Sequence, residues 1–233
     1  ELIDFTQEEV EHINSYYKEA GLFNKKRKKY FRRHYCNSFF EALNFLIFGR
    51  NDRSTIVDLG VGMGTQGILM SIFGARVIGL DLDGVALSIA SKRKIFYEKI
   101  IGKKIDFKIM KVNCFDVNYK DFNGIDGLYS MFAFNMMQPS KSLIDKISLG
   151  FSDDFRLAII DGNNKSILSR ILPSRKRDVW SPQEFELALK EKNMTIESHQ
   201  GKVSFPPILW RIGISILRPI DYILNLFWIF PVS

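Results

Sequence analysis

The sequence is poor in cysteine and histidine, the side chains that most often build disulfide frameworks and transition-metal sites. Cys36 and Cys114 are its only 2 cysteines, too few for a disulfide scaffold. Its 3 histidines, His12, His34 and His199, are far apart, and no pair has the spacing of metal ligands on one helix or hairpin. We therefore expect no metal site.

The sequence also lacks internal repeats and a low-complexity linker, and we expect no signal peptide. Its first residues, Glu1–Tyr17, are polar and acidic, unlike a signal peptide. A chain of 233 residues that is 46% hydrophobic suits one domain with a small appendage and its own core. The net charge of +7 permits an anionic partner without choosing one. We expect a cytoplasmic protein.

Two helices are expected ahead of residue 51. The segment Phe5–Gly21 opens with Thr6 and Glu9, which have the spacing of a capping box. A basic run, Lys25–Arg33, comes next, and apolar residues at helical spacing follow it. We expect these helices, within residues 1–50, to form a cover over the domain that follows.

From residue 55 onward, short β-rich runs alternate with helical patterns. Strands are expected within residues 55–59, 75–83, 105–113, 124–132 and 155–161, with a further helix at 181–193 and a strand at 194–200. This alternation predicts a three-layer, Rossmann-like, doubly wound α/β domain with a mostly parallel sheet, residues 51–204. Residues 205–233 form an apolar, aromatic C-terminal extension.

A glycine-rich turn follows the first expected strand. Thr55–Met70 ends its apolar run with Asp58 and then has glycine at positions 60, 62, 64 and 67. Glycine reaches positive φ and has no Cβ, so a ligand can approach the backbone there. The last three glycines, with Asp81 after the next strand, match a dinucleotide fingerprint. Asp58 argues against that interpretation, because a carboxylate before the loop disfavours a phosphate and favours a positively charged ligand.

Acidic residues end three successive strands, at Asp58, Asp81 and Asp116. The segments VDLGVGMG, VIGLDLD and VNCFDV resemble the class I S-adenosylmethionine-dependent methyltransferases, over about Ile56 to Ile160. The resemblance implies S-adenosyl-L-methionine as cofactor. It also implies the binding residues, which are Asp58, Gly60, Gly62 and Gly64 for the aminoacyl end, Asp81 for the ribose, Leu82, Asp116 and Val117 for the adenine, and Met131 and Phe132 for the sulfonium.

No catalytic base stands out. Many small-molecule methyltransferases of this family carry a histidine soon after the fourth strand, where this chain has Asn135. Further candidates for a base or an acceptor contact are His34, Tyr30, Asp161 and His199. Family members that methylate amino groups of nucleic acids carry an Asn/Asp-Pro-Pro-aromatic run, which FAFNMMQPS does not match.

The acceptor stays open among several interpretations. The extension 205–233, with Arg211 and Arg218 among apolar and aromatic residues, fits either an interfacial membrane segment or the wall of an apolar pocket. We therefore expect a small-molecule or lipid-linked acceptor, with peripheral membrane contact in the interfacial case. The basic run Lys25–Arg33 makes an RNA methyltransferase the alternative, although no RNA-binding module accompanies it. A cofactor-binding partner subunit without activity is a further alternative, and a nicotinamide enzyme is a more distant one.

Overall fold

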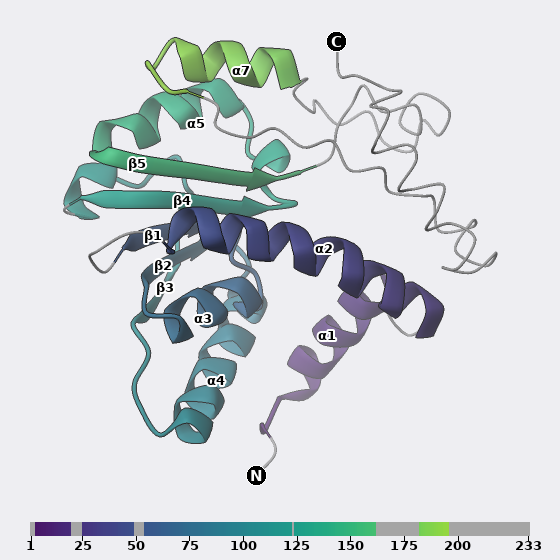
Figure 1. Cartoon of the computed structure of the whole chain (residues 1–233). Helices are drawn as coiled ribbons and strands as arrows, with labels where there is room; N and C mark the ends of the chain where they lie inside the picture. The colour runs from purple at the N-terminus through teal and green to yellow at the C-terminus, as the bar shows by residue number, and fades with distance from the viewer. Residues whose placement is uncertain (1–2, 20–24, 49–53, 123, 162–181, 196–233) are drawn as a thin grey trace.

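The computed structural model describes residues 3–19, 25–48, 54–122, 124–161 and 182–195, which form a parallel sheet between two layers of helices (Figure 1). The sheet has 5 strands in the order β3-β2-β1-β4-β5, and every neighbouring pair is parallel. The strands are β1 (Thr55–Leu59), β2 (Arg76–Asp81), β3 (Phe107–Lys111), β4 (Ile125–Met131) and β5 (Phe151–Ile160). The expected three-layer parallel α/β fold is confirmed.

Helices cover both faces of this sheet (Figure 1). One core contains side chains of α2, α3 and α4, and the other contains side chains of α5 and α7. The helices are α1 (Gln7–Glu19), α2 (Lys25–Leu46), α3 (Thr65–Ile72), α4 (Gly84–Ile101), α5 (Ser140–Ile147) and α7 (Pro182–Lys190), with short 3₁₀ turns η1 (Tyr119–Phe122), η2 (Phe134–Met136) and η3 (Ser148–Gly150). Among the described residues, no helix combines the length and the apolar character needed to cross a membrane.

Alternation along the central strand β1 decides which layer each side chain meets. Val57 and Leu59 are fully buried in the core shared with α5 and α7, whereas Ile56 belongs to the core shared with α2, α3 and α4. Because successive side chains of a strand point to opposite faces, Asp58 faces the same layer as Ile56. A carboxylate is thus built into an otherwise apolar layer.

The helix α2 is anchored by its C-terminal half. Leu43 and Leu46 are buried, and the Phe39 ring meets the Tyr129 ring edge-on at 5.8 Å. The expected basic run Lys25–Arg33 forms the first turns of this helix, which extends past the arrowheads of β4 and β5 (Figure 1). The expectation of two helices before the sheet is therefore confirmed, and their role as a cover stays a prediction.

Strand β5 starts earlier than expected, and most of the strand expected after α7 is not described. Strand β5 begins at Phe151, paired with Ile125, and not at residue 155. The polar residues at 152–154 interrupt the apolar pattern, and a register irregularity between Ile125 and Gly127 accommodates them. The strand expected at 194–200 and the extension 205–233 lie, apart from Met194 and Thr195, outside the described residues. The proposed boundaries at residues 50 and 204 stay predictions.

Candidate functional site

The carboxyl edge of the sheet has one place where the strand order reverses. Strand β1 lies between β2, which follows it in sequence, and β4. The crossovers from these neighbouring strands therefore leave in opposite directions and open a crevice at the carboxyl ends, the usual ligand site of such sheets. Strand register places Leu59 beside both Leu80 and Ser130, so the last residues of β1, β2 and β4 meet there.

Asp58 is the most unusual side chain at this edge. It is 3% exposed, and among the described residues no hydrogen bond to its carboxylate is found. Burial, with a smaller contribution from the charge of Asp81, raises the pKa of Asp58 to about 8. A buried carboxylate is costly unless it is neutralised or paired, so this position suits a ligand that brings a positive group.

The glycines of the turn after β1 lie in two different surroundings. At Gly60, with φ of 72°, an added Cβ would lie 2.3 Å from the Cβ of Ala133, so the loop after β4 leaves no room. At Gly62, with φ of 50°, an added Cβ would meet nothing within 4 Å. Gly64 is the N-cap of α3. The backbone at Gly62 therefore borders open space, where a ligand can approach.

Asp81 at the end of β2 is held by two backbone amides. Its Oδ2 accepts a hydrogen bond from Gly62 N at 2.7 Å, and its Oδ1 accepts one from Asp83 N at 3.0 Å. A carboxylate has about four lone-pair sites, so each oxygen keeps one for a further donor. Two adjacent hydroxyls, as in a ribose, match this arrangement.

The residues expected at an adenine lie at the same edge. Leu82 is exposed directly after Asp81. Asp116 is also exposed, and its backbone N–H donates to Asn113 O at 2.8 Å. The Val117 side chain is buried in the core, so only its backbone is available to a ligand. An apolar surface and a carboxylate acceptor are therefore both present beyond β2 and β3.

The end of β4 is strained. Phe132 has φ of 59°, uncommon for a residue with a Cβ, and its N–H donates to Ile160 O at 2.8 Å. The Met131 sulfur accepts hydrogen bonds from the Tyr129 hydroxyl at 3.2 Å and from Gln66 Nε2 at 3.4 Å. Such outliers gather at functional sites, and this one presents an exposed aromatic ring at the crevice.

Comparison with known proteins supports the fold. No family model and no curated protein sequence matches this chain. The magnesium protoporphyrin IX methyltransferase of Synechocystis PCC 6803, solved with bound S-adenosylhomocysteine, is similar over 78% of this chain and 82% of its own, with 14% identity and a TM-score of 0.61. The YcgJ protein of Bacillus subtilis is similar over 80% and 78%, with 13% identity and a TM-score of 0.59. The plantazolicin methyltransferase BpumL, also solved with S-adenosylhomocysteine, is similar over 84% and 82%, with 19% identity and a TM-score of 0.53.

This chain has the class I methyltransferase fold. In that fold the residues expected at the cofactor come together from three strand ends: Asp58 and the glycine turn after β1, Asp81 and Leu82 after β2, and Met131 and Phe132 after β4. Asp116 and Val117 follow β3 at the same edge. Their roles toward a cofactor stay predictions, and the geometry above is compatible with each of them.

Two of the catalytic candidates lie together at the crevice, and the positions of the other side chains are not described. The backbone N–H of Asn135 donates to the Asp161 carboxylate at 2.8 Å, so these two lie together just beyond β4 and β5. Tyr30 and His34 belong to α2, but their side chains are not described, and His199 lies outside the described residues. Within those residues, no group of 3 or more His, Cys, Asp or Glu side chains is placed to hold a metal ion.

Two acidic residues make contacts that were not predicted from the sequence. Asp83 is the N-cap of α4, and its carboxylate accepts hydrogen bonds from Val85 N at 2.9 Å and Ala86 N at 3.1 Å. An aspartate directly before a helical pattern is a signal for such a cap. Glu9, singled out only for its capping box, also bonds to Lys92, and no local pattern could have linked residues so far apart in sequence.

Proposed function

We propose that the chain is an S-adenosylmethionine-dependent methyltransferase. The observation that carries the proposal is the buried carboxylate of Asp58, without a partner among the described residues, beside the open turn at Gly62. The cofactor has an ammonium group and no phosphate, so it would neutralise this carboxylate. A dinucleotide would instead bring its pyrophosphate toward the same charge, which is unfavourable in a buried site.

Each expected residue has a role that its position supports. Asp58 would bind the amino group, Asp81 the two ribose hydroxyls, and Leu82 and Asp116 the adenine. Met131 and Phe132 would line the sulfonium. The bound cofactor supplies an activated methyl group for in-line displacement, so the protein's task is to hold the acceptor in line and exclude water.

We infer that the acceptor is a small molecule or a lipid-linked molecule, bound beyond the ends of β4 and β5. Exposed Phe132 and Met136 give that region an apolar surface, and Asn135 with Asp161 adds polar groups. Peripheral membrane contact through residues 205–233 and a cytoplasmic location belong to the same proposal. An RNA methyltransferase and an inactive cofactor-binding subunit are the alternatives.

Calorimetric titration with S-adenosylhomocysteine, with NAD as the control ligand, tests the proposal first. We expect micromolar binding of the former and none of the latter. Binding of NAD alone would contradict the cofactor assignment. If neither ligand binds, the proposal of an active enzyme is contradicted in favour of a partner subunit that has lost the cofactor, unless a panel of small-molecule and lipid acceptors restores the binding of S-adenosylhomocysteine.

Replacing Asp81 should weaken cofactor binding. Asp81→Ala removes two charge-assisted hydrogen bonds to ribose hydroxyls, each worth roughly 1.5–3 kcal/mol, so we expect an affinity for S-adenosylhomocysteine at least tenfold lower by calorimetry. Asp126→Ala is the matched control, because the Asp126 carboxylate accepts from Thr55 N at 2.8 Å at the opposite end of β1. Equal affinities in wild type and a folded Asp81→Ala variant would refute the ribose assignment.

A further inference from the structure

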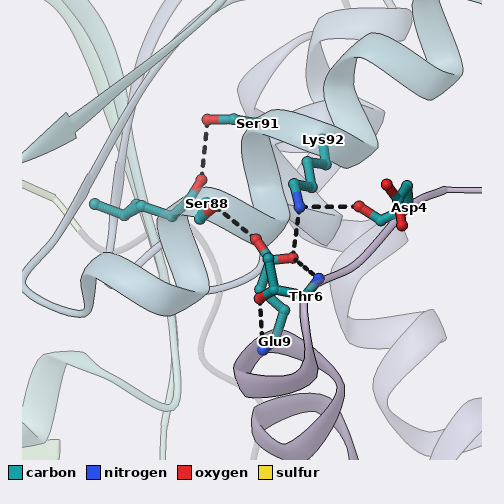
Figure 2. Close-up of polar contacts among 7 residues, drawn as sticks. Asp4, Thr6, Glu9, Ser88, Ser91 and Lys92 are labelled. Atoms are coloured by element: carbon teal, nitrogen blue, oxygen red, sulfur yellow. Dashed lines mark hydrogen bonds and ion pairs between the residues drawn. The ribbon is translucent and has the colours of Figure 1, made fainter.

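The helix α1 is fastened to α4 by a buried carboxylate. Glu9 is 3% exposed, and its two oxygens accept hydrogen bonds from Ser88 Oγ at 2.6 Å, Lys92 Nζ at 2.7 Å and Thr6 N at 2.7 Å. Lys92 Nζ also donates to the carbonyl of Asp4 at 2.9 Å. Figure 2 shows these groups converging between the start of α1 and the middle of α4. We call Glu9, Ser88 and Lys92 the latch.

Within the latch, Glu9 is held as a carboxylate by its hydrogen-bond partners. Hydrogen bonds from Lys92 and Ser88 lower the pKa of Glu9 to about 2, so the carboxylate stays ionised near neutral pH. In this buried ion pair both Glu9 oxygens accept hydrogen bonds and Lys92 donates two, and removing one partner would leave an uncompensated charge. The latch therefore sets where α1 lies.

The direction of α1 brings it to the carboxyl edge. Glu9 meets Ser88 and Lys92, while His12, one turn later, has its Nε2 3.6 Å from Asp83 Oδ2 at the start of α4. The two helices are thus antiparallel, and α1 runs toward the Asp81–Asp83 turn. At about 1.5 Å per residue, the segment after His12 continues roughly 10 Å beyond that contact.

The face that α1 turns toward α4 continues into this projecting end. Residues at i, i+3 and i+7 share one side of a helix, so Glu9, His12 and Tyr16 lie on one face. Tyr16 is 48% exposed, although it follows two residues that contact α4. Tyr17, one position later, is 40% exposed and lies on a different face.

We propose that α1 is a fixed wall of the cofactor pocket, in which Tyr16 contacts the bound nucleoside beside Asp81 and Glu9 is a positioning residue that holds the wall in place. The inference rests on the proposed function, because it concerns the same ligand. It adds one binding residue and one positioning residue. A half-exposed aromatic ring next to a ribose-binding carboxylate supplies an apolar surface that excludes water from one side of the nucleoside.

The latch is tested by Glu9→Gln with Glu98→Gln as the matched control. Glu98 is also a buried carboxylate, 8% exposed, and it is also paired with lysine, at 3.1 Å from Lys104 Nζ. It lies near the C-terminal end of α4, far along the helix from Asp83. We expect both variants to lower the melting temperature, but only Glu9→Gln to weaken S-adenosylhomocysteine binding, by about five- to tenfold.

The wall is tested by Tyr16→Ala with Tyr17→Ala as its control. We expect Tyr16→Ala to weaken S-adenosylhomocysteine binding by at least fivefold and Tyr17→Ala to leave it within twofold, both with melting temperatures near that of wild type. Wild-type binding by both Glu9→Gln and Tyr16→Ala, measured on folded protein, would overturn this inference alone. Absence of binding by the wild-type protein would instead overturn the proposed function, which keeps the two failures distinct.

Discussion

Asp58→Asn is expected to abolish S-adenosylhomocysteine binding and to raise the melting temperature of the ligand-free protein at pH 8. Breaking a buried charge pair by removing one partner costs about 3–5 kcal/mol, so affinity should fall at least a hundredfold. Without ligand, the same carboxylate is 3% exposed, and among the described residues it has no hydrogen-bond partner. The asparagine amide has nearly the same shape as the carboxylate but no charge, so the variant avoids the free-energy cost of a buried charge.

The sign of this stability effect depends on pH. Asp58 has a pKa of about 8 in the folded protein, against an ordinary value of 3.8. Between these values the folded protein holds a proton that the unfolded chain has lost, so rising pH lowers stability, by at most about 1.4 kcal/mol per pH unit. The Asn variant lacks this slope. In thermal scans, the difference between the melting temperatures of Asp58→Asn and wild type should therefore shift in favour of the variant from pH 5 to pH 8.

Glu9→Gln serves as the opposite case in the same scans. The pKa of Glu9 is lowered from 4.5 to about 2, so its carboxylate stabilises the fold above pH 4.5 and loses that effect as pH falls toward 2. The melting temperature of Glu9→Gln should therefore lie below that of wild type near neutral pH, and this difference should shrink only in acid. If Asp58→Asn instead lost stability at pH 8 while still binding S-adenosylhomocysteine, the carboxylate would be a structural group and its assignment to the ligand's ammonium group would be wrong.

The sequence predicted the part of the site that depends on local patterns. An apolar run that stops at Asp58 and a second that stops at Asp81 define β1 and β2, and parallel strands place their carboxyl ends on one edge. Likewise, Thr6 and Glu9 form the expected capping box, with Thr6 N donating to Glu9 Oε2 at 2.7 Å. Both signals lie within a few residues of the feature they predict.

Contacts between distant segments could not be predicted in this way. The bond from Gly62 N to Asp81 Oδ2 depends on how β1 and β2 are aligned, and the latch depends on how α1 docks on α4. The start of β5 was missed because its pairing with Ile125 continues through a polar interruption. In each case tertiary packing, and not local preference, decides the outcome.

The affinity for S-adenosylhomocysteine should rise steeply with pH up to about 8. Only the ionised form of Asp58 can pair with the ligand's ammonium group, and in the free protein burial keeps this side chain protonated below its pKa of about 8. Each pH unit below that value reduces the ionised fraction about tenfold. Calorimetric titrations between pH 5.5 and 8 should therefore show close to a tenfold gain in affinity per unit, falling again once the ligand's amino group loses its proton.

The same linkage requires that binding release a proton. At pH 6.5 the free protein holds a proton on Asp58 that the complex cannot keep, so titrations in buffers of different ionisation enthalpy should report close to one proton released per ligand bound. Asp81→Ala, which keeps Asp58, should bind more weakly yet release the same proton. No release from wild type, with a flat pH profile, would mean that Asp58 is already ionised without ligand or does not meet the ammonium group. The first would contradict the raised pKa of Asp58, and the second would contradict its role in the site.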